Sequence, residues 1–312
     1  MSHYPHSLPA LTSVKFGQMR SGSTPARVPR DRGPALQSSA FAKCGGGSAW
    51  LAACFRTIRP LSSLVVGVLT ASAAMAARGK PTVSGVAPGL AMTTLAMFGF
   101  TVNDIFDYSK DRAAGIRRPI AEGTLSRWSA AWLATWLLLC TSVLAVLAGS
   151  AGTVLAFTAA ALFWYSPAAG RYPLCKDVYA AGLCCGPLYY GALAGGLARP
   201  WTSYAILACF VLGREILMDG AELSGDLKGG ARTIAAMLGQ RPSMRIGSTL
   251  MLASAAVLAA IVRGRLAGFT AVATLVTLAW VLCRPGLDSN GRARQSRFPM
   301  LLGAVTVACA GA

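Results

Sequence analysis

The chain has 312 residues, of which 54% are hydrophobic and only 13% are charged, and its mean hydropathy is +0.52. A soluble domain carries about 25% charged residues, so this composition excludes an ordinary soluble protein and predicts an integral membrane protein. The formal net charge is +18. That charge alone is compatible with a nucleic-acid partner, but in a membrane protein the position of the basic residues reports topology.

The N-terminal segment 1–48 is rich in Ser, Pro, Gly and Arg, and Asp31 is its only acidic residue. Such a composition buries too little apolar surface to fold, and it predicts a disordered basic tail. An acid-poor, Ser- and Arg-rich segment is also typical of organelle transit peptides, and that alternative stays open. The rest of the chain, 49–312, is predicted to be a single helical membrane domain.

Nearly continuous apolar stretches fill this second part. About 20 helical residues are needed to span roughly 30 Å of hydrocarbon. Eight of the stretches are predicted spans, and a ninth at the C-terminal end is short. We therefore expect an all-α polytopic membrane bundle of about nine transmembrane helices. The stretches are 60–77, 86–102, 128–148, 151–165, 178–198, 202–218, 244–262, 266–283 and 298–312.

The basic residues are distributed unevenly between alternate loops. Of the 29 Lys and Arg residues, 24 lie in the N-terminal tail and every second loop, and the other loops hold only five. Cytoplasmic loops carry such an excess, so the N-terminus and the polar loops after the second and sixth spans are expected on the cytoplasmic, stromal or matrix side. We expect a bacterial plasma membrane, with an organelle membrane as the alternative, and no nucleic-acid partner.

The cysteines and histidines exclude several kinds of site. Both histidines, His3 and His6, lie in the tail, and the nine cysteines are scattered without a C-x-x-C pair. A thiolate or histidine metal centre and a Ser-His mechanism are therefore not expected in the membrane domain.

Seven of the eleven acidic residues lie in two short clusters, each at the end of an apolar run. Each cluster holds a trio at positions i, i+3 and i+7, which lie on one face of a helix within an arc of roughly 60°. Carboxylates close to hydrocarbon are costly unless they are paired, metal-bound or functional. Oxygen-only trios favour hard divalent cations that hold a phosphorylated substrate. The trios are Asp104, Asp107 and Asp111, and Asp219, Glu222 and Asp226.

Basic residues accompany both trios. Arginine suits bidentate phosphate contact and lysine supplies a point charge. For Arg118 and Arg232, phosphate binding and a purely topological charge are equally good interpretations of position alone, whereas Arg241 is interpreted as a topological charge. The other candidates for phosphate contact are Arg59, Lys176 and Lys228. In the fifth span, the small-residue pairs Gly182–Gly186 and Gly191–Gly195 predict close helix packing.

The pattern N-D-x-x-D-x-x-x-D from Asn103 to Asp111, followed by Arg118-Pro119, resembles the first aspartate-rich motif of the UbiA family of intramembrane prenyltransferases. The stretch from Arg214 to Thr233 is similar to the second motif of that family, with Met218 where Lys is frequent and Glu222 in place of the middle Asp. Matching stretches also occur at Arg59-Pro60 and at Tyr165-Ser166-Pro167 followed by Lys176-Asp177. The Arg214-Glu215 lead-in resembles the branch that prenylates glycerol-phosphate lipids, and also bacterial members of unknown acceptor.

This resemblance implies a helical bundle around a central cavity that is open to lipid. It implies that each acidic trio binds one Mg²⁺ and that the two ions bridge the diphosphate of a polyprenyl donor. Neutralisation of the remaining charge would fall to Arg118, Lys176, Lys228 and Arg232, with Arg59 at the first helix. Asn103 would orient a ligand or an acceptor. The implied activity is transfer of the isoprenyl group to an aromatic or lipid-alcohol acceptor.

Three other interpretations stay open. A terpene cyclase of the same family would ionise the same diphosphate without an acceptor. A metal-ion transporter would use membrane acids without needing arginines beside them, and the positions of Arg118 and Arg232 argue against it. A catalytically silent scaffold is compatible with Met218 and Glu222.

Overall fold

The computed structural model describes residues 47–80, 83–113, 115–148, 152–169, 175–197, 201–229 and 233–310. The predicted disordered tail lies outside this range, except for its last two residues. Within the described ranges every regular element is a helix and none is a strand, as the sequence predicts.

In its described part, each predicted apolar stretch overlaps one long helix, and the stretch 178–198 continues past the end of that helix at Ala194. Among these, α3, α4, α7, α12 and α13 are long and apolar enough to cross a membrane by length and composition. The total of nine spans stays a prediction. The long helices are α3 (Pro60–Ala77), α4 (Val83–Phe106), α7 (Arg127–Ala148), α8 (Gly152–Ala169), α9 (Cys175–Ala194), α10 (Trp201–Gly229), α12 (Gln240–Ile261), α13 (Arg265–Cys283) and α15 (Arg297–Ala310).

Shorter helices connect or precede these. The last two residues of the segment assigned to the tail, Gly47 and Ser48, already belong to the first of them. Four of the short helices lie in the polar segments that the sequence places beside the acidic clusters and after α13. They are α2 (Gly47–Ile58), α5 (Tyr108–Ala113), α6 (Pro119–Glu122), α11 (Ile234–Leu238) and α14 (Ser289–Gln295).

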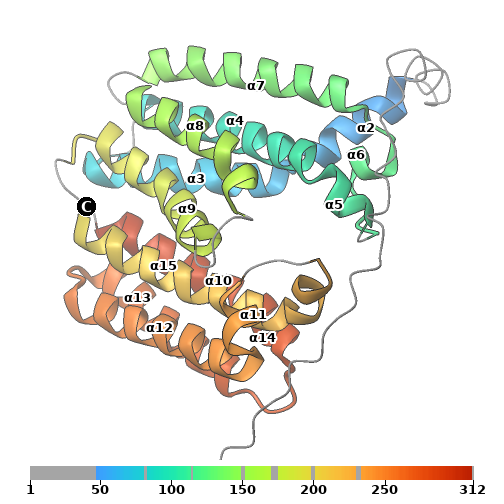
Figure 1. Ribbon diagram of the computed structural model, residues 1–312. Coiled ribbons are helices and arrows are strands. Elements are labelled where there is room, and N and C mark those ends of the chain that lie inside the picture. The colour runs from blue at the N-terminus through green and yellow to red at the C-terminus, as the bar shows by residue number, and fades with distance from the viewer. Residues whose placement is uncertain are drawn as a thin grey trace, which may run out of the picture. The chain divides into compact units, whose positions relative to one another are not determined.

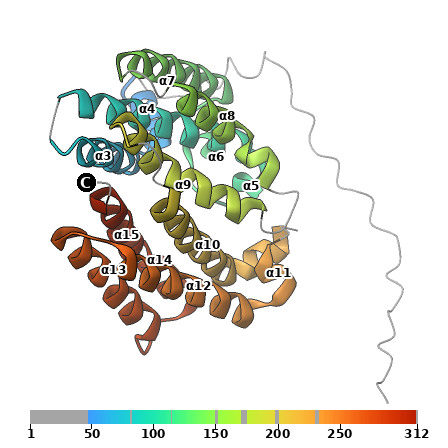
Figure 2. The same ribbon diagram turned by 90° about the vertical axis from the view of Figure 1, so that its left-hand side faces the viewer.

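The long helices pack as a closed series of neighbours (Figures 1 and 2). Contacts run from α3 through α4, α8, α9, α10, α12, α13 and α15 and return to α3, while α7 covers α4 from outside. The ends of α4 and α10 that carry the acids are followed by the short helices α5, α6 and α11 (Figure 1). This arrangement brings segments that are more than 100 residues apart in sequence into one bundle.

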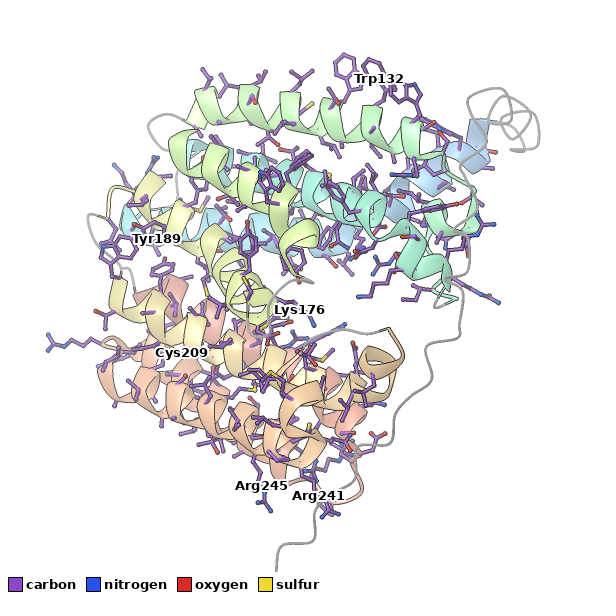
Figure 3. All side chains as sticks on the ribbon, in the orientation of Figure 1. Trp132, Lys176, Tyr189, Cys209, Arg241 and Arg245 are labelled. Carbon is purple, nitrogen blue, oxygen red and sulfur yellow. The ribbon has the colours of Figure 1, made fainter. Side chains whose placement is uncertain are left out.

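Large apolar side chains cover the outside of the bundle. Trp128, Trp132 and Trp136 are all exposed along α7, and Trp132 points away from the other helices (Figure 3). In water such a surface would be unfavourable, because large exposed apolar patches drive association between molecules. Together with the composition, it agrees with an integral membrane protein.

Two glycine pairs on α9 have different surroundings. A Cβ at Gly191 would collide with the carbonyl oxygen of Thr70, and one at Gly195 would lie 2.6 Å from the carbonyl oxygen of Ala74, so the predicted close packing is confirmed there. At Gly182 and Gly186 no described atom lies within 4 Å of such a Cβ, and the prediction is wrong. The reason is geometric, since nine residues rotate an α-helix by about half a turn and place the two pairs on opposite faces.

Candidate active site

The first acidic trio lies where α4 ends and α5 begins. Asp104 is in the last turn of α4, Asp107 is a single non-helical residue, and Asp111 is in α5. Backbone hydrogen bonds nevertheless continue across the break, from Asp107 N to Asn103 O at 2.9 Å and from Asp111 N to Asp107 O at 2.8 Å. The predicted single helical face therefore persists through a local bend.

Arg118 lies among all three carboxylates of this trio. Its Nη1 atom is 3.0 Å from Asp104 Oδ1, 3.9 Å from Asp107 Oδ2 and 2.8 Å from Asp111 Oδ2. Arg118 is the residue before α6, in extended backbone, and Pro119 follows it at the first helical position, where proline is favoured. The short loop that ends at this proline thus places the Arg118 guanidinium beside the three acids.

Arg59 approaches the same trio from the junction of α2 and α3. Its Nη2 donates to Asp104 Oδ1 at 2.7 Å, and its guanidinium carbon lies 4.7 Å from the centre of the Phe100 ring. Arg59 has φ +45°, and it is the only described non-glycine residue with positive φ. Side chains disfavour this left-handed region, so the strain that is held here points to a positional requirement for the guanidinium.

The trio is not fully satisfied by these contacts. Asn103 Nδ2 donates to Asp107 Oδ2 at 3.0 Å, whereas Asp111 Oδ2 is buried and accepts no hydrogen bond from a described residue, although Arg118 Nη1 lies 2.8 Å from it. Burial raises the pKa of the Asp111 carboxyl, although the Arg118 charge beside it acts in the opposite direction.

The second trio lies entirely on α10. Asp219 is 2% exposed, and its Oδ1 accepts a 2.6 Å hydrogen bond from Lys176 Nζ at the start of α9. Figure 3 shows Lys176 at the end of α9 that approaches α10. Glu222 is exposed. The side chains of Asp226 and Lys228 and all of Arg232 lie outside the described residues, so their predicted roles stay untested.

Two residues without an assigned role lie beside Asp219. Asp177 is 1% exposed, and Glu215 pairs with Arg214 at 2.7 Å. Sequence reasoning noted both only as parts of longer motifs. The available signal was an acid next to Lys176 at the beginning of an apolar stretch.

Tyr165 lies on α8, in the stretch that the sequence places before Lys176. Its ring stacks on that of Tyr179 of α9, with centroids 5.8 Å apart. No described hydrogen bond or ion pair joins the two acidic clusters directly.

The chemistry of these groups fits a hard divalent cation. Among the described residues, no three Asp, Glu, His or Cys side chains converge closely enough to enclose an ion. Mg²⁺ does not need such a cage, since it is usually held by one or two carboxylates together with water and substrate phosphates. Asp219 Oδ2 is a buried carboxylate oxygen that accepts no hydrogen bond from a described residue, and Asp111 Oδ2 is buried with the Arg118 guanidinium 2.8 Å away.

Comparison with known proteins defines the class. Residues 64–304 match the UbiA prenyltransferase family. The match spans both acidic motifs and most of the helical bundle, and the chain belongs to this family.

Two curated relatives are similar to this chain over part of their length. A digeranylgeranylglyceryl phosphate synthase of Thermococcus gammatolerans is 32% identical over 152 residues, which are 48% of this chain and 55% of that protein. A protein of the same name from Natronomonas pharaonis is 29% identical over 195 residues, which are 61% and 70% of the two chains. The chain thus aligns with little more than half the length of the first of these relatives.

Solved structures share the fold. A UbiA homologue from Aeropyrum pernix K1 superposes with a TM-score of 0.67 at 20% identity, over 80% of this chain and 97% of that one. A UbiA homologue from Archaeoglobus fulgidus, solved with GPP and Mg²⁺, gives a TM-score of 0.63 at 15% identity, over 82% and 99% of the two chains.

Proposed function

We propose that this protein is a Mg²⁺-dependent intramembrane prenyltransferase. It moves an isoprenyl group from a polyprenyl diphosphate to a hydrophobic acceptor. The observation that carries the proposal is the convergence of Arg59 and Arg118 on the carboxylates of the first trio, at the end of an apolar helix. A transporter for metal ions has no use for two guanidinium groups in that position, whereas a diphosphate site needs both charges.

The residues divide into anionic and cationic groups. Asp104, Asp107 and Asp111 would hold one Mg²⁺, and Asp219, Glu222 and Asp226 a second. When bound, the ions supply positive charge that stabilises the diphosphate as a leaving group. Cations beside the acids would contact the phosphate oxygens, and they are Arg59, Arg118, Lys176, Lys228 and Arg232.

The reaction breaks the bond between C1 of the isoprenyl chain and the bridging oxygen. Negative charge then grows on the leaving diphosphate, where the Arg118 and Arg59 guanidinium groups stabilise it by charge-assisted hydrogen bonds. The acceptor oxygen or ring carbon forms the new bond to C1. Its proton leaves to the released diphosphate, to water or to a motif carboxylate, since neither histidine lies in the bundle sequence.

The proposal also specifies the chemical class of the acceptor. The Arg214-Glu215 lead-in and the names of the curated relatives favour the alcohol of a glycerol-phosphate lipid over an aromatic ring. The test uses membranes that contain the protein, a set of prenyl diphosphates, and both acceptor classes, with products identified by mass spectrometry. A lipid product heavier by one prenyl unit is expected, and no prenylated product with any donor–acceptor pair overturns the proposal.

A further inference from the structure

Asp177 is a buried carboxyl group that accepts no hydrogen bond from a described N–H group. The residue is 1% exposed, and both Oδ1 and Oδ2 lack a hydrogen-bond partner within the described part of the chain. Asp177 is the third residue of α9, in the first turn, where the helix dipole favours an acidic side chain. A surface position would satisfy that preference, whereas Asp177 is buried and accepts no N–H of the described residues.

The described cations near Asp177 are paired with other acids. Lys176 donates to Asp219 Oδ1, and Arg214 donates to Glu215. Asp177 has no ion pair among the described residues. A buried carboxylate without an ion-pair partner is unfavourable, and a bound cation would relieve that cost.

Asp219 lies beside Asp177, because the Lys176 side chain that precedes Asp177 donates to Asp219 Oδ1 at 2.6 Å. The two carboxyl groups are within hydrogen-bond reach of each other, and Asp219 Oδ2 accepts no hydrogen bond from a described N–H group. Two buried carboxyl groups, one on α9 and one on α10, thus face each other. Two adjacent carboxylates with open oxygens are the donor set that a hard divalent cation prefers.

We propose that Asp177 is a ligand of the second divalent-cation site, so that α9 and α10 build this site together. If the site were built from α10 alone, the exposed Glu222 would have to be the ligand next to Asp219. In our proposal the buried Asp177 is that ligand. This proposal rests on one part of the proposed function, namely that these acids bind a divalent cation.

The test measures Mn²⁺ binding by electron paramagnetic resonance on the full chain in detergent. Asp177→Asn is expected to weaken Mn²⁺ binding at least 10-fold, within the range seen when groups that support a metal site are removed. Without metal, the same variant is expected to keep at least the Tm of wild-type protein, because asparagine removes a buried acid and can donate an N–H to Asp219. A carboxylate that served only the structure would lower the Tm when it is replaced.

The matched control is Asp288→Asn, the same substitution at a helix cap. Asp288 Oδ1 accepts the Gly291 N–H at 2.7 Å, and asparagine caps equally well, so Mn²⁺ binding and Tm should not change. Asp177→Asn protein that binds Mn²⁺ like wild-type, while wild-type transfers prenyl groups, overturns the Asp177 proposal alone. Wild-type protein that binds no Mn²⁺ overturns both this proposal and the proposed function.

A second variant tests the same proposal if Asp177→Asn protein does not fold. Asp177→Cys places a soft thiolate at the same position, and such ligands favour Cd²⁺ over Mg²⁺. Stoichiometric Cd²⁺ should then produce a thiolate-to-metal charge-transfer band in the ultraviolet difference spectrum against wild-type protein. Asp288→Cys should give no such band. The absence of the band in folded Asp177→Cys protein overturns the proposal.

Discussion

Arg59 and Arg118 donate to the same oxygen, Asp104 Oδ1, at 2.7 and 3.0 Å, although 59 residues separate them in sequence. One comes from the junction of α2 and α3, and the other from the loop before α6. A carboxylate that is 2% exposed therefore holds two guanidinium groups at the end of the α4 helix. In the proposed reaction, these are the groups that neutralise the diphosphate.

The first prediction concerns Arg118. Arg118→Ala should lower prenyl transfer at least 100-fold, the loss typical when one group that stabilises transition-state charge is removed. Arg118→Lys should keep more activity but less than wild-type protein, because a point charge cannot reach several oxygens as a planar guanidinium does. The measurement is product formation by mass spectrometry, with expression and detergent elution profile as folding checks.

Arg241→Ala is the control for this series. Arg241 is exposed at the start of α12 and was interpreted from the sequence as a topological charge. Its removal should leave turnover within about two-fold of wild-type. Equal losses in Arg118→Ala and Arg241→Ala protein would show that the assay reports general basic charge rather than the site.

The second prediction concerns the divalent cation. Turnover should stop with EDTA and return with Mg²⁺ or Mn²⁺, because both regions offer only oxygen ligands. Asp107→Ala should abolish turnover while the protein stays folded, since Asp107 is 28% exposed and fills no core position. Turnover that continues after EDTA treatment and dialysis would contradict the assignment of the acids.

The third prediction concerns helix packing on α9. Gly191→Ala should destabilise the protein by about 1–3 kcal/mol, because the added Cβ would push against the carbonyl of Thr70 on α3. Gly182→Ala, the same change nine residues earlier, should be neutral or stabilising by up to about 1 kcal/mol, since alanine favours helix over glycine. Thermal unfolding in detergent compares the two, and equal Tm values would disprove the difference in packing.

The fourth prediction concerns topology. Single cysteines at Arg117 and Arg241, in a background without other reactive thiols, should both be labelled from the cytoplasmic side. A cysteine at Lys80 should be labelled from the opposite side. The reason is the excess of Lys and Arg in alternate loops. Labelling of positions 117 and 241 from different sides would require an odd number of spans between them.

Much of this architecture was predictable because it depends on local properties. Helix positions follow from apolar runs of sufficient length, and the trio spacing places Asp104, Asp107 and Asp111 together without knowledge of the tertiary fold. Arg118 was predictable for the same reason, since only a short loop separates it from Asp111. Its contact with all three acids confirms that they share a face.

Other features depend on how separate helices meet, which one sequence does not report. The bend at Asp107 and the left-handed backbone of Arg59 are local responses to tertiary packing. Glycine spacing alone cannot tell which face of α9 meets α3, so Gly182 was assigned wrongly. The proximity of Asp177 to Asp219 joins positions on two helices, and no periodic pattern connects them.

The last prediction separates a transferase from a cyclase of the same family. Both need the same ionisation site, so variants of the six acids cannot discriminate between them, and only the fate of the carbocation can. With Mg²⁺ and a long allylic diphosphate but no acceptor, purified protein should release diphosphate slowly and form mainly the prenyl alcohol, because water reacts in place of the absent acceptor.

Adding the matching lipid-alcohol or aromatic acceptor should then speed diphosphate release and yield a product heavier by one prenyl unit. A transferase must leave room beside C1 for a second substrate, whereas a cyclase must fill that room with the distal double bond of its own chain. Diphosphate release and product mass are measured in the same reaction, with boiled protein as the blank. A single cyclic hydrocarbon, formed without acceptor at a rate that no acceptor changes, would show that the protein is a cyclase and not a transferase.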